Sequence, residues 1–299
     1  MKQHPSQRRA YWVAELAKLS GSFGKDATRM AEELRTELAA EGSQALLDHL
    51  RLCGAVPEQY ERDSSQEKLY SKYTDAIVSE SFTALGLTSC LINARADAAD
   101  VQARAQNYTL VADTKAFRLS RTAKNQKDFK VQAMDGWRNE CTYAVLICPI
   151  YQLPARTSQI YQQAIARNVC ILSYAHVAAL VGLSLRQGKS AAESGLQQVL
   201  QCISLLHPSK SAVDYWLAVN RTLVDALGPE HGLWKMEKIA SIEGLAMAKD
   251  ESLRYLRSER NRLLGLSHQE ALEELIRLTG LDSRIAQIER LEHGDLLGV

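Results

Sequence analysis

The chain has 299 residues, 46% of them hydrophobic and 24% charged, and its formal net charge is +1. A composition of this kind supports a large hydrophobic core and excludes a wholly disordered chain. A near-neutral total does not exclude nucleic acid as a partner, because binding depends on how charge is distributed over the surface.

The first sixty residues predict a helical N-terminal segment. Apolar residues recur at helical spacing in three stretches, 11–19, 27–40 and 44–52. Gly42 and Gly54 follow the last two stretches, as glycine commonly does at the ends of helices. Pro57 and the polar residues after it predict a loop that leads into the next element.

Residues 61–190 predict a mixed α/β core. Residues 64–86 form an amphipathic pattern that opens with Ser64-Ser65-Gln66-Glu67, the spacing of a capping box, and ends at Gly86. The period then changes, and three short strand-like runs predict a meander at 88–93, 100–104 and 108–115. Beyond a basic loop and helix, buried strands are expected at 142–150 and 169–174, with a helix at 157–167 between them.

The chain after His176 predicts an almost wholly helical C-terminal region. Helical periodicity runs through five segments, 191–206, 212–227, 233–264, 268–279 and 283–292. We therefore predict an α/β (α+β) fold with a mixed central sheet flanked by helices. Its parts are a helical segment at 1–60, the core at 61–190 and a helical annex at 191–299, with the annex expected to form one compact unit with the core.

Several features predict a cytoplasmic protein without a membrane partner. The start of the chain leads into no apolar signal core. The longest uncharged apolar stretch, 169–185, predicts a buried strand and a core helix rather than a membrane span, because it contains Ser173, His176 and Gly182. The six cysteines have no C-x-x-C spacing, and most lie in apolar runs, where a free thiol behaves as a small hydrophobic group.

The strongest candidate for a catalytic site lies at the end of the third run of the meander. Asp113 and Lys115 alternate with Thr114, so on a strand their side chains project to the same face. Asp100 opens the preceding strand. If the two strands pair antiparallel through the bend at 106–107, Asp100 lies beside the end of its neighbour, and the two carboxylates and the lysine converge.

This set of groups suits the hydrolysis of a phosphodiester. Carboxylate oxygens hold Mg²⁺, which also binds phosphate oxygens and lowers the pKa of a bound water. We expect Asp100 and Asp113 as metal ligands, together with the backbone carbonyl of Thr114, and a second Mg²⁺ for the leaving oxygen. Lys115 would orient the attacking water and stabilise developing negative charge.

The D-x-K pattern is weak by itself, and a second copy occurs at Asp128-Phe129-Lys130. No strand leads into that copy, so we interpret it as a solvated helix face. The first copy has the strand, the upstream acid and a preceding helix, which favour a catalytic site over a surface ion pair. Asp97 competes with Asp100 for the role of upstream acid, because both lie in the same turn.

A third catalytic acid is expected from the helix at 64–86. Glu67 opens this helix, where the alternative is a capping residue, and Glu80 falls on its apolar face, where a buried acid needs a partner. We favour Glu67 and leave Glu80 as the alternative.

The residues after Lys115 predict contact with DNA. Basic residues recur about every third position from 118 to 130, with Ser, Thr, Asn and Gln between them. Lysine and arginine bind phosphates, whereas arginine and amide side chains read base edges; the alternative is a solvated helix face. The expected DNA-binding residues are Arg118, Ser120, Arg121, Thr122, Lys124, Asn125, Gln126, Lys127 and Lys130.

From the residues alone, three functions fit: a sequence-specific nuclease, a structure-specific repair or recombination nuclease, and a DNA-binding regulator without catalysis. The stretch from Val111 to Val131, together with Gln66-Glu67-Lys68-Leu69, Asp100-Val101, Tyr143-Ala144-Val145-Leu146 and Ser158-Gln159-Ile160, resembles the HindIII-type type II restriction endonucleases. The resemblance covers most of the chain in order and fades in the C-terminal helices.

The resemblance implies a PD-(D/E)xK nuclease fold and Mg²⁺-dependent double-strand cleavage of a palindrome. Asp100, Asp113 and Lys115 fall on the catalytic positions of the family, although Ala99 and not proline precedes Asp100. A shared specificity would be AAGCTT, cut after the first A. The implied partners are double-stranded DNA, a second identical subunit, and a cognate DNA methyltransferase that acts on the same site without direct contact.

Overall fold

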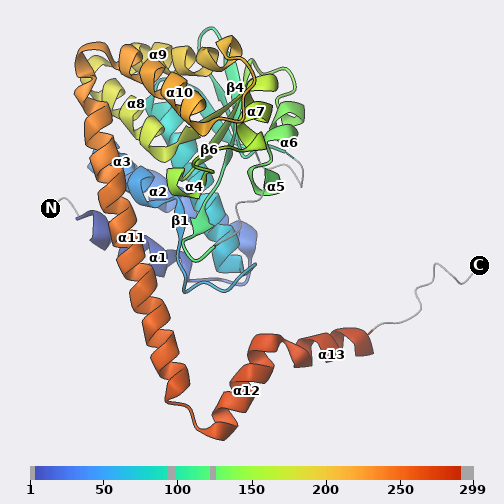
Figure 1. Ribbon diagram of the computed structural model, residues 1–299. Coiled ribbons are helices and arrows are strands. Elements are labelled where there is room, and N and C mark those ends of the chain that lie inside the picture. Colours follow the sequence, from blue (N-terminus) through green and yellow to red (C-terminus); the bar gives the residue numbers. More distant parts are fainter. Residues whose placement is uncertain (1–3, 93–97, 122–125, 291–299) are drawn as a thin grey trace, which may run out of the picture. The chain divides into compact units, whose positions relative to one another are not determined.

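The computed structural model describes residues 4–92, 98–121 and 126–290 (Figure 1). Contacts divide the chain into two compact units, Met1–Ser252 and Leu253–Val299. The boundary between the two units falls within the predicted C-terminal region at 191–299.

The first unit is built on a five-stranded mixed sheet, as the sequence predicts. Its strands are β2 (Thr88–Leu91), β3 (Val101–Arg104), β4 (Thr109–Thr114), β6 (Tyr143–Cys148) and β7 (Val169–Ser173). The sheet order follows the chain order, with β2, β3 and β4 antiparallel and β4, β6 and β7 parallel. The predicted meander is therefore confirmed. Every residue of β6 and β7 is buried, which explains their continuous apolar sequence.

Helices cover both faces of this sheet (Figure 1). The helices α4 (Ser65–Ala84) and α8 (Tyr174–Gln187) lie on one face, and α6 (Val131–Trp137) and α7 (Gln159–Ala166) lie on the other. Helix α4 begins where the capping spacing predicts, because the Ser64 side chain accepts a hydrogen bond from the Glu67 backbone N–H at 3.2 Å.

The N-terminal helices support α4 from outside. They are α1 (Pro5–Leu16), α2 (Phe23–Glu41) and α3 (Ser43–Leu52), and each contacts α4. A two-residue parallel pairing joins β1 (Ala55–Val56) to β5 (Phe117–Arg118). The sequence predicts neither of these strands, because such short pairings arise only when the fold brings the two segments together. A short helix, α5, follows at Gln126–Phe129.

The rest of the first unit is helical. Helices α9 (Lys189–Cys202) and α10 (Ala212–Leu227) pack on α8, and three single 3₁₀ turns occur at Ile150–Gln152, Ile203–Leu205 and Gly228–Glu230. Helix α11 spans Gly232–Leu264 and crosses from the first unit into the second.

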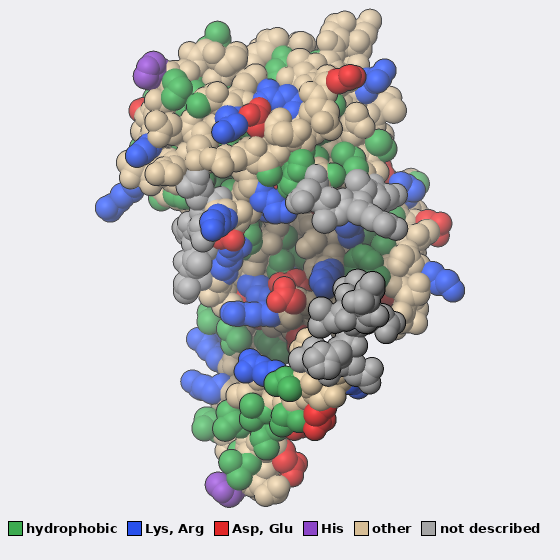
Figure 2. Space-filling view, turned by 90° about the vertical axis from the view of Figure 1, so that its right-hand side faces the viewer, with side chains coloured by type: hydrophobic (Ala, Val, Ile, Leu, Met, Phe, Trp, Pro, Cys, Tyr) green, Lys and Arg blue, Asp and Glu red, His purple; other side chains and the backbone are tan. Residues whose placement is uncertain are grey.

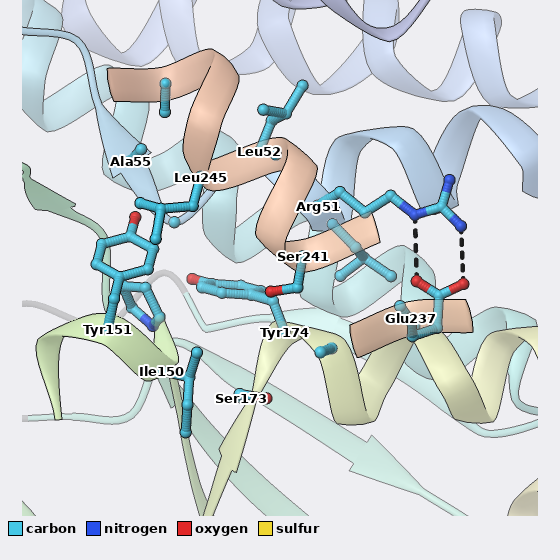
Figure 3. A pocket seen from close by; sticks show the side chains of 17 residues that line it. Arg51, Leu52, Ala55, Ile150, Tyr151, Ser173, Tyr174, Glu237, Ser241 and Leu245 are labelled. Carbon is cyan, nitrogen blue, oxygen red and sulfur yellow. Dashed lines mark hydrogen bonds and ion pairs between the residues drawn. The ribbon is translucent and has the colours of Figure 1, made fainter. Parts of the chain in front are cut away.

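The N-terminal part of α11 docks against α3. Figure 3 shows the Arg51 guanidinium facing the Glu237 carboxylate, with N–O distances of 3.1 and 2.7 Å. Nearby, Gly244 approaches the main chain so closely that an added Cβ would lie 2.7 Å from the Arg51 carbonyl oxygen. Glycine is therefore required at this contact.

The second unit contains the end of α11, then α12 (His268–Thr279) and α13 (Leu281–Glu289). Neither α12 nor α13 has a buried residue. Across the parts of the chain that the structure describes, no helix combines the length and the apolar character needed to cross a bilayer.

Candidate active site

Two neighbouring strands bring Asp100 and Asp113 together. In the antiparallel pairing of β3 with β4, Val101 lies opposite Ala112, and the Asp100 backbone N–H donates to the Ala112 carbonyl at 3.0 Å. The Asp100 carboxylate also accepts a hydrogen bond from the Thr114 backbone N–H at 3.2 Å. The start of one strand thus lies beside the end of the other, as expected from the sequence.

Asp113 and Lys115 project to the same side and form an ion pair. The main chain of Lys115 is fixed from two directions. Its N–H donates to the Ile147 carbonyl of β6 at 2.8 Å, and its carbonyl accepts from the Tyr174 hydroxyl at 2.9 Å. The central sheet and the first residue of α8 therefore hold the lysine in position.

A third carboxylate that sequence reasoning missed, Asp75 of α4, joins this group. It is buried, and it accepts a hydrogen bond from the Thr114 hydroxyl. Lys72, one turn earlier in α4, links it to the strands, because its ammonium lies 3.0 Å from Asp75 and 3.7 Å from Asp100. The sequence holds one signal that could have identified Asp75: it follows Lys72 by three residues on the buried face of the helix before the sheet.

Burial raises the proton affinity of the acids. The pKa of Asp75 rises to about 7 because the side chain is desolvated, and the charge of Asp100 adds to the increase. Desolvation also raises the pKa of Asp113, to about 6. The positive charge of Lys115 opposes this increase, and the negative charge of Asp100 adds to it. Carboxylates packed this closely resist full ionisation unless cations accompany them.

The arrangement fits a divalent cation in its donor chemistry. Asp113 Oδ2 is buried and, apart from its ion contact with Lys115, accepts no hydrogen bond. Hard carboxylate oxygens of Asp100 and Asp113 are the ligands that Mg²⁺ prefers. Among the described residues, however, no three acidic, histidine or cysteine side chains are already gathered as a metal-binding set. Lys72 and Lys115 instead provide the positive charge beside these acids.

The two acids considered from α4 lie elsewhere. The Glu67 carboxylate accepts from the Arg118 guanidinium at 3.1 Å and from the Asp63 backbone N–H at 2.7 Å. Glu80 pairs with Arg35 at 3.2 Å. The partners of Glu67 and Glu80 thus lie outside the group of Asp100, Asp113 and Lys115, whereas Lys72 links Asp75 to Asp100. The other expected rival, Asp97, lies outside the described residues.

Of the expected DNA-binding residues, Arg118 lies inside the fold and not on its surface. Its guanidinium is buried and donates to the carbonyls of Pro57, Glu58 and Tyr60, at distances between 2.5 and 3.4 Å. The expected contact of Arg118 with DNA stays a prediction, and the structure places its guanidinium against the main chain of residues 57–60. Arg118 thus joins the loop after β1 to β5.

The neighbours of Arg118 strengthen the same junction. Ser120 binds Glu58 through both its N–H and its hydroxyl, each at 2.8 Å. Arg121 pairs with Asp128 and stacks over the Phe117 ring, with its guanidinium carbon 4.2 Å from the ring centre. Lys127 and Lys130 are exposed, and the Lys130 ammonium lies 5.1 Å from the centre of the Trp137 ring.

The remaining expected contacts fall in part outside the structural description. Thr122, Lys124 and Asn125 lie outside the described residues, and Gln126 is described only as the first residue of α5. Beside Arg121 is an open cavity of about 480 Å³, which is lined by residues between 62 and 67 and by residues between 116 and 121. Figure 2 shows Lys and Arg side chains gathered around a hollow in the middle of the face that it presents.

Comparison with known proteins gives two concordant matches. A sequence profile described as HindIII restriction endonuclease matches residues 9–292 of this chain. The chain is also 33% identical over 261 residues to the type II restriction enzyme HindIII of Haemophilus influenzae, an alignment that covers 83% of this chain and 84% of the relative.

Proposed function

From the premise that the chain belongs to the HindIII restriction endonuclease family, we propose that it cuts both strands of a palindromic DNA site with Mg²⁺. Membership makes it a type II restriction endonuclease, a site-specific deoxyribonuclease. The observation that carries the proposed chemistry is the convergence of Asp100, Asp113 and Lys115 at the ends of β3 and β4.

Each residue has a distinct proposed role. Asp100 and Asp113 hold Mg²⁺ with the Thr114 carbonyl, and two ions per site are proposed. Bound there, the metal supplies an activated water and neutralises charge on the phosphate. Lys115, fixed through its main chain, orients the water and stabilises negative charge that develops on the phosphate.

A third catalytic acid is proposed to act beside Asp100 and Asp113. Glu67 and Asp75 are both candidates, and the contacts favour Asp75, because Lys72 and Thr114 connect it to the two strands. Glu67 supports the loop after β1 through Arg118. We therefore propose Asp75 for the role that the sequence suggested for Glu67.

DNA is proposed to contact the basic segment that follows the catalytic strand. The proposed contacts are Arg121, Thr122, Lys124, Asn125, Gln126, Lys127 and Lys130. Lys127 and Lys130 support the proposal because they are exposed. The cavity beside Arg121, between residues 62–67 and 116–121, supports it as well. Ser120 and Arg118 would act by holding this surface in place.

We further propose a second identical subunit, a methyltransferase partner and a cytoplasmic location. A symmetric double-strand cut is simplest with two identical subunits, each cutting one strand. A methyltransferase of the same specificity would protect the host. The described cysteines are free thiols, which supports a reducing cytoplasmic location.

Digestion of an unmethylated plasmid of known sequence, with Mg²⁺ or with EDTA, tests the proposal. We expect discrete Mg²⁺-dependent fragments, and sequencing of their ends should show cleavage of AAGCTT after the first A. Discrete fragments with other ends would replace the proposed specificity. Structure-dependent nicks would favour a repair nuclease, and an intact plasmid in both reactions would favour a non-catalytic DNA-binding protein.

A further inference from the structure

The second unit exposes apolar side chains that a stable structure has to cover. In α12, Leu272, Leu275, Ile276 and Leu278 are between 40% and 61% exposed. In α13, Leu281, Ile285 and Ile288 are between 46% and 67% exposed. Exposed apolar side chains that recur along one short segment are typical of a binding surface in a soluble protein.

Helices α12 and α13 have well-defined ends, but their apolar side chains are not buried. Ser267 caps α12 through a reciprocal capping box with Glu270, and Arg262 binds Glu274 at 2.7 Å. Yet α12 has 12 residues and α13 has 9, and no residue of either is buried. Isolated helices of this length are marginal in water, and an amphipathic helix gains most of its stability from packing its apolar face. The sequence therefore specifies helices that need a partner.

The charges of this segment complement each other. The end of α11, residues 253–264, contains four arginines and one glutamate, a net charge of 4 − 1 = +3. Helix α12 contains three glutamates and one arginine, a net charge of 1 − 3 = −2. Arg262 and Arg277 already pair with Glu274 within one chain, so Arg257, Arg260 and Glu273 are the charges that a second chain would use. A two-fold axis brings unlike segments of identical chains together twice, so a basic and an acidic stretch on one chain favour self-association.

We propose that residues 253–289 form a dimerisation arm, whose partner is the same arm in a second copy of this chain. The apolar faces of α12 and α13 pack across the two-fold axis, and the basic end of α11 lies against the acidic α12 of the other subunit. The choice of an identical partner rests on the proposed function, because a palindromic double-strand cut requires two active sites.

The first test compares full-length chains by sedimentation equilibrium, without DNA or metal. The wild type should have twice the 33.3 kDa mass of the chain. The double variant Leu275→Glu/Ile276→Glu should be monomeric, with a dissociation constant raised by about 100-fold or more. The matched control is Leu205→Glu, because Leu205 is 84% exposed in the first unit, and this variant should remain dimeric.

Tryptophan fluorescence separates dissociation from unfolding. All four tryptophans, Trp12, Trp137, Trp216 and Trp234, lie in the first unit, so their emission reports on that unit alone. An unchanged emission spectrum in a monomeric Leu275→Glu/Ile276→Glu variant supports the proposal. A monomeric wild type overturns it, and so does a double variant that remains dimeric.

A charge-swap experiment tests the pairing of arms. Glu273→Lys/Glu274→Lys makes both segments basic, and Arg257→Glu/Arg260→Glu makes the end of α11 acidic like α12. Each variant alone should dimerise weakly, and an equimolar mixture should restore dimers made of one chain of each kind. Failure of the mixture to recover would overturn the arm pairing. Since neither experiment measures cleavage, a dimer that leaves plasmid intact would contradict the proposed function and leave this inference standing.

Discussion

At the scale of single residues, the choice of the third acid depends on contacts that cross between elements. Asp75 and Glu67 lie on the same helix, Glu67 in its first turn and Asp75 near its middle, and both accept hydrogen bonds. Asp75 bonds to Thr114 and Lys72 beside the catalytic strands, whereas Glu67 bonds to Arg118 and the Asp63 N–H. Two carboxylates of one helix thus differ in the groups that surround them, and this difference carries the proposal that Asp75 is the third acid.

Substitution of these two acids should have unequal effects. Asp75→Asn should reduce the rate of cleavage by about 100-fold or more at saturating DNA, because it removes a charge beside Asp100 and Thr114. Glu67→Gln, the matched control in the same helix, should change the rate by less than about 10-fold. Single-turnover cleavage of a short duplex with Mg²⁺ measures both. The reverse order of effects would return the catalytic role to Glu67.

At the scale of elements, the segment after β4 combines internal support with an exposed basic surface. Arg118 and Ser120 tie β5 to the loop that follows β1, so this part of the basic run is structural. Lys127 and Lys130 follow on the exposed side. The regular basic spacing of the sequence therefore includes side chains that the fold turns inward and side chains that it exposes, a distinction that only the folded chain makes.

Removal of one phosphate contact should reduce the salt dependence of DNA binding. For Lys127→Ala, the slope of log affinity against log salt should fall by about one unit, because one fewer counterion is released on binding. Lys25→Ala, an exposed lysine of α2, is the control and should leave the slope unchanged. Binding is measured in Ca²⁺ or with the Asp113→Asn variant. An equal slope for Lys127→Ala and the wild type would show that Lys127 makes no phosphate contact.

The docking of α11 depends on the absence of a side chain at Gly244. Gly244→Ala would place a methyl group 2.7 Å from the Arg51 carbonyl, so the helix or the end of α3 must shift. We expect a loss of about 1–3 kcal/mol in the free energy of unfolding. Gly232→Ala in the same helix meets no atom within 4 Å and should be neutral or slightly stabilising. Urea denaturation checks both, and equal midpoints for the two variants would contradict the steric argument.

At the scale of the whole molecule, the buried acids couple stability to pH. In the metal-free protein, folding raises the pKa of Asp75 to about 7 and that of Asp113 to about 6, from ordinary values near 4. The folded state therefore holds protons that the unfolded chain has already released. Stability from these protons is full at low pH and is lost as the pH rises through the raised pKa values.

The expected result is measurable in EDTA between pH 5 and pH 8. Over this range the wild type should lose about 2–3 kcal/mol of unfolding free energy relative to Asp75→Asn, whose amide does not titrate. Urea denaturation of both proteins at each pH isolates the contribution of Asp75. Parallel pH profiles for the two proteins would show that Asp75 has an ordinary pKa in the folded state.

The sequence alone determined the local elements and identified Asp100, Asp113 and Lys115 as candidate catalytic residues. Periodicity identified the helices, the antiparallel meander and the buried parallel strands, because the side-chain patterns of helix and strand depend on near neighbours. The alternation of Asp113 and Lys115 fixed their common face, and the length of the meander placed Asp100 beside them. The resemblance of the 111–131 stretch indicated the family.

Only the tertiary structure decided which distant groups meet. Asp75 lies beside Thr114, and Glu67 lies beside Arg118, because of the way α4 packs across β3 and β4. Arg118 turned inward because β5 pairs with β1, more than sixty positions earlier. The unburied faces of α12 and α13 likewise emerged only in the folded chain. Periodicity shows that a face is apolar, but the partner of that face depends on packing between distant segments.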